Sequence, residues 1–136
     1  MTDQTLNPEG WPRPSGYANG VVATGRLVVL AGQIGWNPAT LQFESDDIVS
    51  QTRQALLNVR TLLTEAGATP EDVLRMTWYI TNREEYVSAR REIGEAYREV
   101  IGAIYPAMSV IVISGLVEPR AKVEIEATAV VSGDSE

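Results

Sequence analysis

The stretch "YPAMSVIVISG", residues 105–115, decides which kind of sheet this chain can form. Its proline favours an extended backbone and cannot continue a helix, so a strand is expected directly after it. Four apolar residues follow one another at positions 110–113, and a similar run, "LVVLA", occupies positions 27–31. Because successive side chains of a strand point to opposite faces, both runs predict strands that are apolar on both faces.

The residues on either side of this stretch predict the element order β-β-α-β-α-β-β. Runs of β-branched or alternating residues place the strands, and the expected ranges are 20–25, 27–35, 73–81, 108–114 and 121–131. Gly25 and Arg26 separate the first two runs, which predicts a hairpin.

Apolar residues at helical spacing predict two helices between these strands. The first is expected to have Ser45 or Asp46 as its N-cap and to end at Gly67. The second is expected to run from Asn82, as its N-cap, to Gly102.

This order predicts an α+β fold with one mixed sheet. Right-handed crossovers place both helices on the same face of that sheet. Because the other face is then bare and partly apolar, we expect it to be buried by self-association. The alternative is that the N-terminal segment covers it. We expect an extended arm at residues 1–16, one domain at residues 17–131 and a polar tail at residues 132–136.

The composition excludes several kinds of chemistry. The chain has no cysteine and no histidine, so it offers neither a thiol nucleophile nor the usual general base. Its net charge of −7 opposes binding to nucleic acid. Since no leader-like or membrane-spanning segment is visible, we expect a soluble, cytoplasmic protein without membrane contact.

Two acidic pairs could suggest a metal site, namely Asp46 with Asp47 and Glu84 with Glu85. Both pairs fall at the expected helix N-termini, where carboxylates complement the helix dipole. We therefore expect no metal and no cofactor.

Several motifs together resemble the RidA (YjgF/YER057c/UK114) family. They are "AGQIGWNP" after the expected hairpin, "LLTEAGAT" at the end of the first helix, and the final "EIEATAVV". The resemblance extends from about Ser15 to Val131. It implies a chorismate-mutase-like fold, a homotrimer, and a small-molecule cleft at each subunit interface. The best-known activity of that family is hydrolysis of reactive enamines and imines to 2-keto acids and ammonia.

The resemblance also implies which residues of this chain form the cleft. Family members carry an arginine that grips the substrate carboxylate, and Met108 stands at that position here. The other matched positions are Tyr17, Gly32, Ser109, Val110 and Glu124. Glu124 matches a glutamate that holds the hydrolytic water. The residues alone favour placing Glu124 on the polar side of an alternating strand, and only the resemblance favours the cleft. Tyr17 could equally be a ring at the start of a sheet, and Gly32 could mark a bulge.

Two functions of different class follow from this pattern. The first is a deaminase-like hydrolase with weak or altered activity on 2-imino acids, because Met108 offers no charge. The second is a ligand-binding trimer that kept the cleft and lost the chemistry. Three other arginines could replace the missing one, namely Arg75, Arg91 and Arg120. A ribonuclease or translation inhibitor, a third label used in the family, fits poorly with an acidic chain that lacks histidine.

Overall fold

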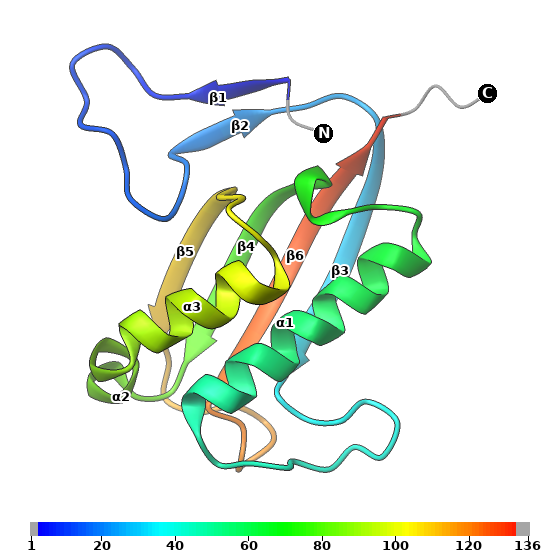
Figure 1. Cartoon of the computed structure of the whole chain (residues 1–136), viewed down its shortest axis with the longest axis vertical. Coiled ribbons are helices and arrows are strands. Elements are labelled where there is room, and N and C mark those ends of the chain that lie inside the picture. The colour runs from blue at the N-terminus through cyan, green and yellow to red at the C-terminus, as the bar shows by residue number, and fades with distance from the viewer. Residues whose placement is uncertain (1–2, 133–136) are drawn as a thin grey trace.

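The computed structural model describes residues 3–132, and its centre is a four-stranded mixed sheet (Figure 1). The strands lie in the order β3-β6-β4-β5. Their bounds are Arg26–Ile34 for β3, Val73–Ile80 for β4, Ala107–Val112 for β5 and Val123–Val131 for β6. β4 and β5 are parallel, whereas β6 is antiparallel to both β3 and β4.

Helices α1 (Ile48–Glu65) and α3 (Arg90–Val100) cover one face of this sheet, as Figure 1 shows. Alternation along β4 and β6 builds the core beneath them. Met76, Trp78 and Ile80 are buried on β4, and Val123 and Ile125 are buried on β6. The predicted α+β fold with a mixed sheet and helices on one face is therefore confirmed.

Helix α1 begins one or two residues later than its sequence suggests. Its N-cap is Asp47, whose side chain accepts a hydrogen bond from the N–H of Ser50 at 2.9 Å. The Ser45 hydroxyl accepts from the N–H of Asp47, so it supports the cap without being it. The predicted end is confirmed, because Gly67 follows the helix with a φ of +75°.

The second predicted helix is broken in two. Asn82 caps α2 (Arg83–Ser88), accepting from the N–H of Glu85 at 2.8 Å, and α3 then starts at Arg90. Ala89 separates them and serves both as the C-cap of α2 and as the N-cap of α3. Because alanine has the highest helix propensity, the sequence gives no sign of this break. A short 3-10 helix, η1 (Pro70–Asp72), precedes β4.

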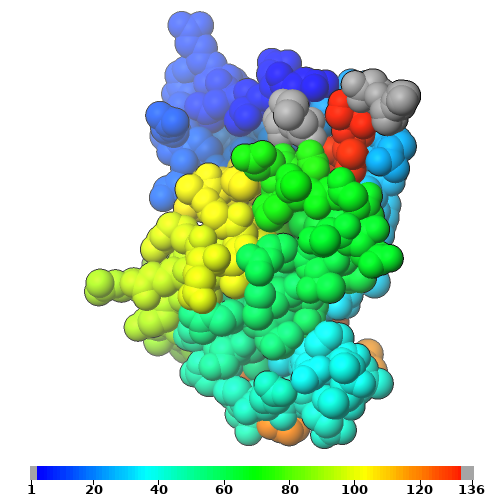
Figure 2. Space-filling view, turned by 45° about the vertical axis from the view of Figure 1, so that its right-hand side comes forward, coloured from blue at the N-terminus to red at the C-terminus, as the bar shows by residue number. Residues whose placement is uncertain are grey.

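The predicted hairpin between residues 20–25 and 27–35 is wrong. Strand β2 (Gly20–Val22) pairs instead with β1 (Gln4–Leu6), and the two form a separate small sheet at one end of the molecule (Figures 1 and 2). The reason lies at Gly25, which has a φ of +150°. A Cβ there would lie 2.1 Å from the carbonyl oxygen of Val131, so the bare backbone packs against β6 and directs β2 away from the sheet.

The face of the sheet opposite the helices is bare within the described chain, and its margins are apolar. Leu27 and Val29 on β3 are 66% and 70% exposed, and Ile111 on β5 is 44% exposed. Polar residues, including Glu124 and Glu126, lie between these margins on β6. The arm leaves Leu27 and Val29 uncovered, so the alternative in which it covers this face fails there.

Two further predictions concern the ends of the chain and the membrane. Of the proposed tail at residues 132–136, only Ser132 is among the described residues. Residues 1–2 of the arm also lie outside the described residues. Within residues 3–132, no helix is both long and apolar enough to cross a bilayer.

Candidate functional site

A pocket of about 860 Å³ lies where β5, helices α2 and α3, and the arm meet. Three of the residues singled out in the sequence line it, namely Tyr17, Met108 and Val110. Met108 and Val110 reach it because they alternate along β5 and pair in register with Met76 and Trp78 of β4, on the helix side of the sheet.

A backbone contact of Ala18, just after the arm, brings Tyr17 to this pocket. Ala18 forms a parallel bridge with Ala107, and its N–H donates to the carbonyl oxygen of Pro106 at 2.9 Å. The proline that starts the β5 stretch thus has a second role, because its carbonyl anchors the arm. Tyr17, next to Ala18, is thereby held at the mouth of the pocket.

Helices α2 and α3 supply the opposite wall. Tyr86, Arg90, Gly94 and Arg98 all line the pocket, and they recur at every fourth position. Tyr86 belongs to α2, whereas Arg90, Gly94 and Arg98 lie on α3, where residues at this spacing share one face of the helix. A Cβ at position 94 would lie 3.5 Å from Nη1 of Arg98, so the Arg98 side chain extends back along the helix toward Gly94.

Aromatic rings form the inner part of the pocket. The rings of Tyr97 and Tyr105 stack with centroids 5.7 Å apart, and Trp78 lies 6.2 Å from Tyr97. The Tyr97 hydroxyl donates to the carbonyl oxygen of Ile104, and burial raises the pKa of Tyr97. The indole N–H of Trp78 is buried and has no acceptor among the described residues.

The charge of the pocket wall is opposite to that of the whole protein. Arg90 and Arg98 line it, and among the described residues no carboxylate does. Within residues 3–132, neither guanidinium has a carboxylate within 4.0 Å. Burial raises the pKa of Tyr86, and the positive charge of Arg90 opposes that rise. Arg90 therefore acts electrostatically on a group that shares its pocket.

Gly32 and Glu124 lie together, but away from this pocket. A Cβ at position 32 would be 2.1 Å from Oε2 of Glu124, so the carboxylate occupies the space that the glycine leaves free. Glu124 lies between the buried Val123 and Ile125 and therefore points to the bare face of the sheet. The β3–β6 register shifts between Leu30 and Gln33, so the bulge expected as the alternative meaning of Gly32 is also present.

The bare face near Glu124 carries further hydrogen-bonding groups. The hydroxyl of Tyr79 on β4 donates to Oε1 of Glu126 at 2.9 Å, and this hydrogen bond raises the pKa of Tyr79. Ser109 faces the same side, since it pairs in register with Thr77 between two residues that point to the pocket. Ser109 therefore lies apart from Met108 and Val110.

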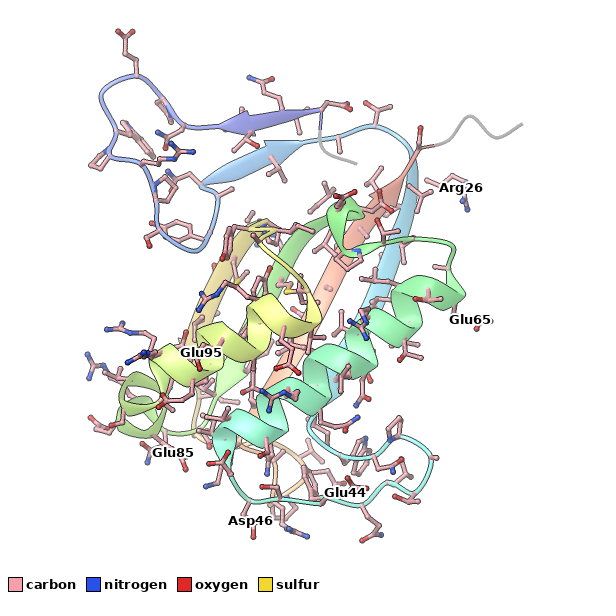
Figure 3. All side chains as sticks on the ribbon, in the orientation of Figure 1. Arg26, Glu44, Asp46, Glu65, Glu85 and Glu95 are labelled. Carbon is pink, nitrogen blue, oxygen red and sulfur yellow. The ribbon has the colours of Figure 1, made fainter. Side chains whose placement is uncertain are left out.

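The three arginines proposed as replacements lie elsewhere, and none lines the pocket. Arg120 donates two hydrogen bonds to Asp46, and Arg91 pairs with Glu95 at 3.7 Å (Asp46 and Glu95 are labelled in Figure 3). Arg75 is exposed on β4. The sequence reasoning missed Arg90 and Arg98, although their spacing of four from Gly94 was a usable signal.

Comparisons with known proteins agree over almost the whole chain. A family model described as endoribonuclease L-PSP matches residues 12–131. A 2-iminobutanoate/2-iminopropanoate deaminase of Escherichia coli is 30% identical over 128 residues, covering 93% of this chain and 97% of that protein.

Solved structures give the same result. The Rid-family protein YyfB of Yersinia pestis is 34% identical, with a TM-score of 0.84 over 96% of this chain and 100% of that one. TdcF of Escherichia coli, solved with bound serine, is 30% identical, with a TM-score of 0.68 over 96% of this chain and 100% of that one.

Proposed function

This chain belongs to the RidA/YjgF/L-PSP family, and from that membership we propose that it hydrolyses small reactive imines or enamines as a homotrimer, with weak activity on 2-imino acids. In this reaction water adds to the imine carbon, the C–N bond breaks after the nitrogen is protonated, and a carbonyl compound and ammonia leave. The chain must bind the imine, hold the water and accept a proton from it.

The observation that carries this proposal is the division of the candidate residues between two surfaces. Tyr17, Met108 and Val110 line the pocket, whereas Gly32 and Glu124 meet on the bare face of the sheet. A neighbouring copy would bring its Glu124 to the pocket of the first chain. A cleft between two subunits then contains both the binding wall and the carboxylate that holds the water.

The bare face supports this arrangement. Its margins, Leu27, Val29 and Ile111, expose apolar surface that a neighbouring copy would bury. Light scattering tests the assembly directly: a trimer is expected, and a monomer at micromolar concentration would overturn the shared cleft.

Met108 determines which imines are hydrolysed well. A thioether contributes apolar, adaptable contact and no positive charge. A bidentate arginine contact to a carboxylate strengthens binding about ten- to a hundredfold. We therefore expect neutral or otherwise unclamped imines to be hydrolysed better than 2-imino acids.

The experiment compares ammonia release from freshly generated 2-imino acids by the unchanged protein and by Met108→Arg. The variant is expected to gain about tenfold or more. The matched control is Val112→Arg, which adds the same charge on β5 at a position that does not line the pocket. A parent protein already as active as the Met108→Arg variant would refute the role of Met108.

A ligand-binding trimer without catalysis is the second candidate. It is favoured by the pocket wall itself, where none of the carboxylates in residues 3–132 lies. Absence of turnover on 2-imino acids and on neutral imines, for the parent and for Met108→Arg, would select this function.

A further inference from the structure

The pocket carries two cations on α3, Arg90 and Arg98, that the proposed function does not use. We propose that Arg90 and Arg98 bind an anionic group, a carboxylate or a phosphate, that the ligand carries several atoms away from its reacting carbon. The ligand class is then an imine or enamine with a distal acid and a flat or apolar body. The imine part rests on the proposed function, whereas the anion site does not.

The two arginines stand on one face of α3 with an opening between them. Arg98 lies eight positions after Arg90, which corresponds to about 12 Å along the helix axis. Arg98 narrows this gap, because its Nη1 lies over Gly94, halfway to Arg90. Glycine at position 94 leaves the helix surface low there, so an anionic group can approach both guanidinium groups.

Among the described residues no carboxylate pairs with Arg90 or Arg98, whereas three other arginines have one. Arg53 pairs with Glu99 at 3.0 Å, Arg91 with Glu95, and Arg120 with Asp46. In a chain with 18 acidic and 11 basic residues, two guanidinium groups on a wall to which no described carboxylate contributes make a local positive site. Such a site attracts a carboxylate or phosphate and repels cations.

The rest of the wall determines the body of the ligand. Tyr97, Tyr105 and Trp78 provide aromatic surface in the same pocket as the arginines. Flat or apolar groups pack well on such rings. The buried indole N–H of Trp78 adds one donor that no described residue satisfies. Met108 therefore contacts an uncharged part of the ligand, and the anionic group of the ligand lies at α3.

The test measures binding without turnover. The probes are 3-phenylpropionate, 3-phenylpropyl phosphate and the neutral 3-phenylpropionamide, titrated by calorimetry at low ionic strength. The variants are Arg90→Gln and Arg98→Gln, and the matched control is Arg91→Gln, which removes the same charge from the same helix outside the pocket. Circular dichroism and light scattering verify that each variant keeps its fold and assembly.

Each pocket variant is expected to weaken binding of the two acids about tenfold, because it removes a charge-assisted contact. Arg91→Gln should leave acid binding unchanged, and the amide should bind all four proteins alike. Preference for the phosphate or for the carboxylate then identifies which anion the site takes.

Three outcomes would overturn the anion site. They are absence of binding by both acids, an equal loss for acid and amide, and an equal loss for Arg91→Gln. The proposed hydrolysis is judged separately. If the acids bind through the arginines but no imine is hydrolysed, the proposed function is refuted and the anion site stands. If imines are hydrolysed but acid binding does not depend on the arginines, the anion site is refuted and the proposed function stands.

Discussion

Replacing Gly32 by alanine tests whether the position of the Glu124 carboxylate matters for turnover. The new Cβ would lie 2.1 Å from Oε2, 2.6 Å from Cδ and 2.7 Å from Cγ of Glu124. Ordinary contacts between such atoms are about 3.5 Å, so the carboxylate must move by about 1 Å or more. A displacement of that size in a reacting group can cost about a hundredfold in rate.

The same geometry predicts only a small effect on stability. Glu124 is partly exposed, so its side chain can rotate away at a cost of about 0.5–1.5 kcal/mol. Loss of glycine entropy in the unfolded chain offsets about 0.5 kcal/mol of that. We therefore expect Gly32→Ala to lower kcat/KM for imine hydrolysis about a hundredfold, while the free energy of unfolding changes by about 1 kcal/mol or less.

The assay follows ammonia release from the best imine substrate, together with urea unfolding of the same samples. Gly115→Ala is the matched control, because nothing lies within 4 Å of the position its Cβ would take. It should keep full activity. If Gly32→Ala keeps full activity, the reaction does not depend on the position of the Glu124 carboxylate. If Gly32→Ala loses several kcal/mol in the free energy of unfolding, the Glu124 carboxylate cannot move aside.

Two further predictions concern stability. Gly94→Ala should raise the free energy of unfolding by about 0.5–1 kcal/mol, because it removes a glycine from a helix interior and adds only an ordinary 3.5 Å contact with Arg98; a lower urea midpoint would contradict this. Burial raises the pKa of Tyr97, so the unfolded chain loses this proton first as pH rises above about 10, and the free energy of unfolding should fall by about 1 kcal/mol per pH unit. Tyr97→Phe should make that fall shallower in urea titrations at about pH 9 and about pH 11, and equal slopes would refute the assignment.

The layout of the main sheet could be predicted because each strand carries its own pattern. Apolar Met76, Trp78 and Ile80 alternate with the polar Thr77 and Tyr79 along β4, and apolar and polar residues alternate along β6 from Val123 to Ala129. Helix ends were predicted to within one or two residues, because Asn82 and Gly67 act through local hydrogen bonds and backbone angles. Such signals are local, and they do not depend on which distant element packs against the helix or strand.

The parts that could not be predicted depend on distant partners. Gly25 and Arg26 have the composition of a hairpin turn. The path of the chain there is decided instead by the pairing of β2 with β1 and by the packing of Gly25 on Val131. The wall of the pocket is a similar case. Arg90 and Arg91 are neighbours in sequence, and only the position of α3 beside β5 places the first in the pocket and pairs the second with Glu95.

The N-terminal segment, from the arm through Tyr17 and Ala18, helps to form the pocket but is not part of the main hydrophobic core. None of residues 3–27 belongs to the main hydrophobic cluster, and Ala18 meets β5 through its backbone. The ring of Tyr17 can therefore be exchanged, shifted or removed by changes in the arm without repacking the core. The part of the ligand preference that Tyr17 sets can thus change while the core, which includes the pocket residues Trp78 and Tyr97, stays as it is.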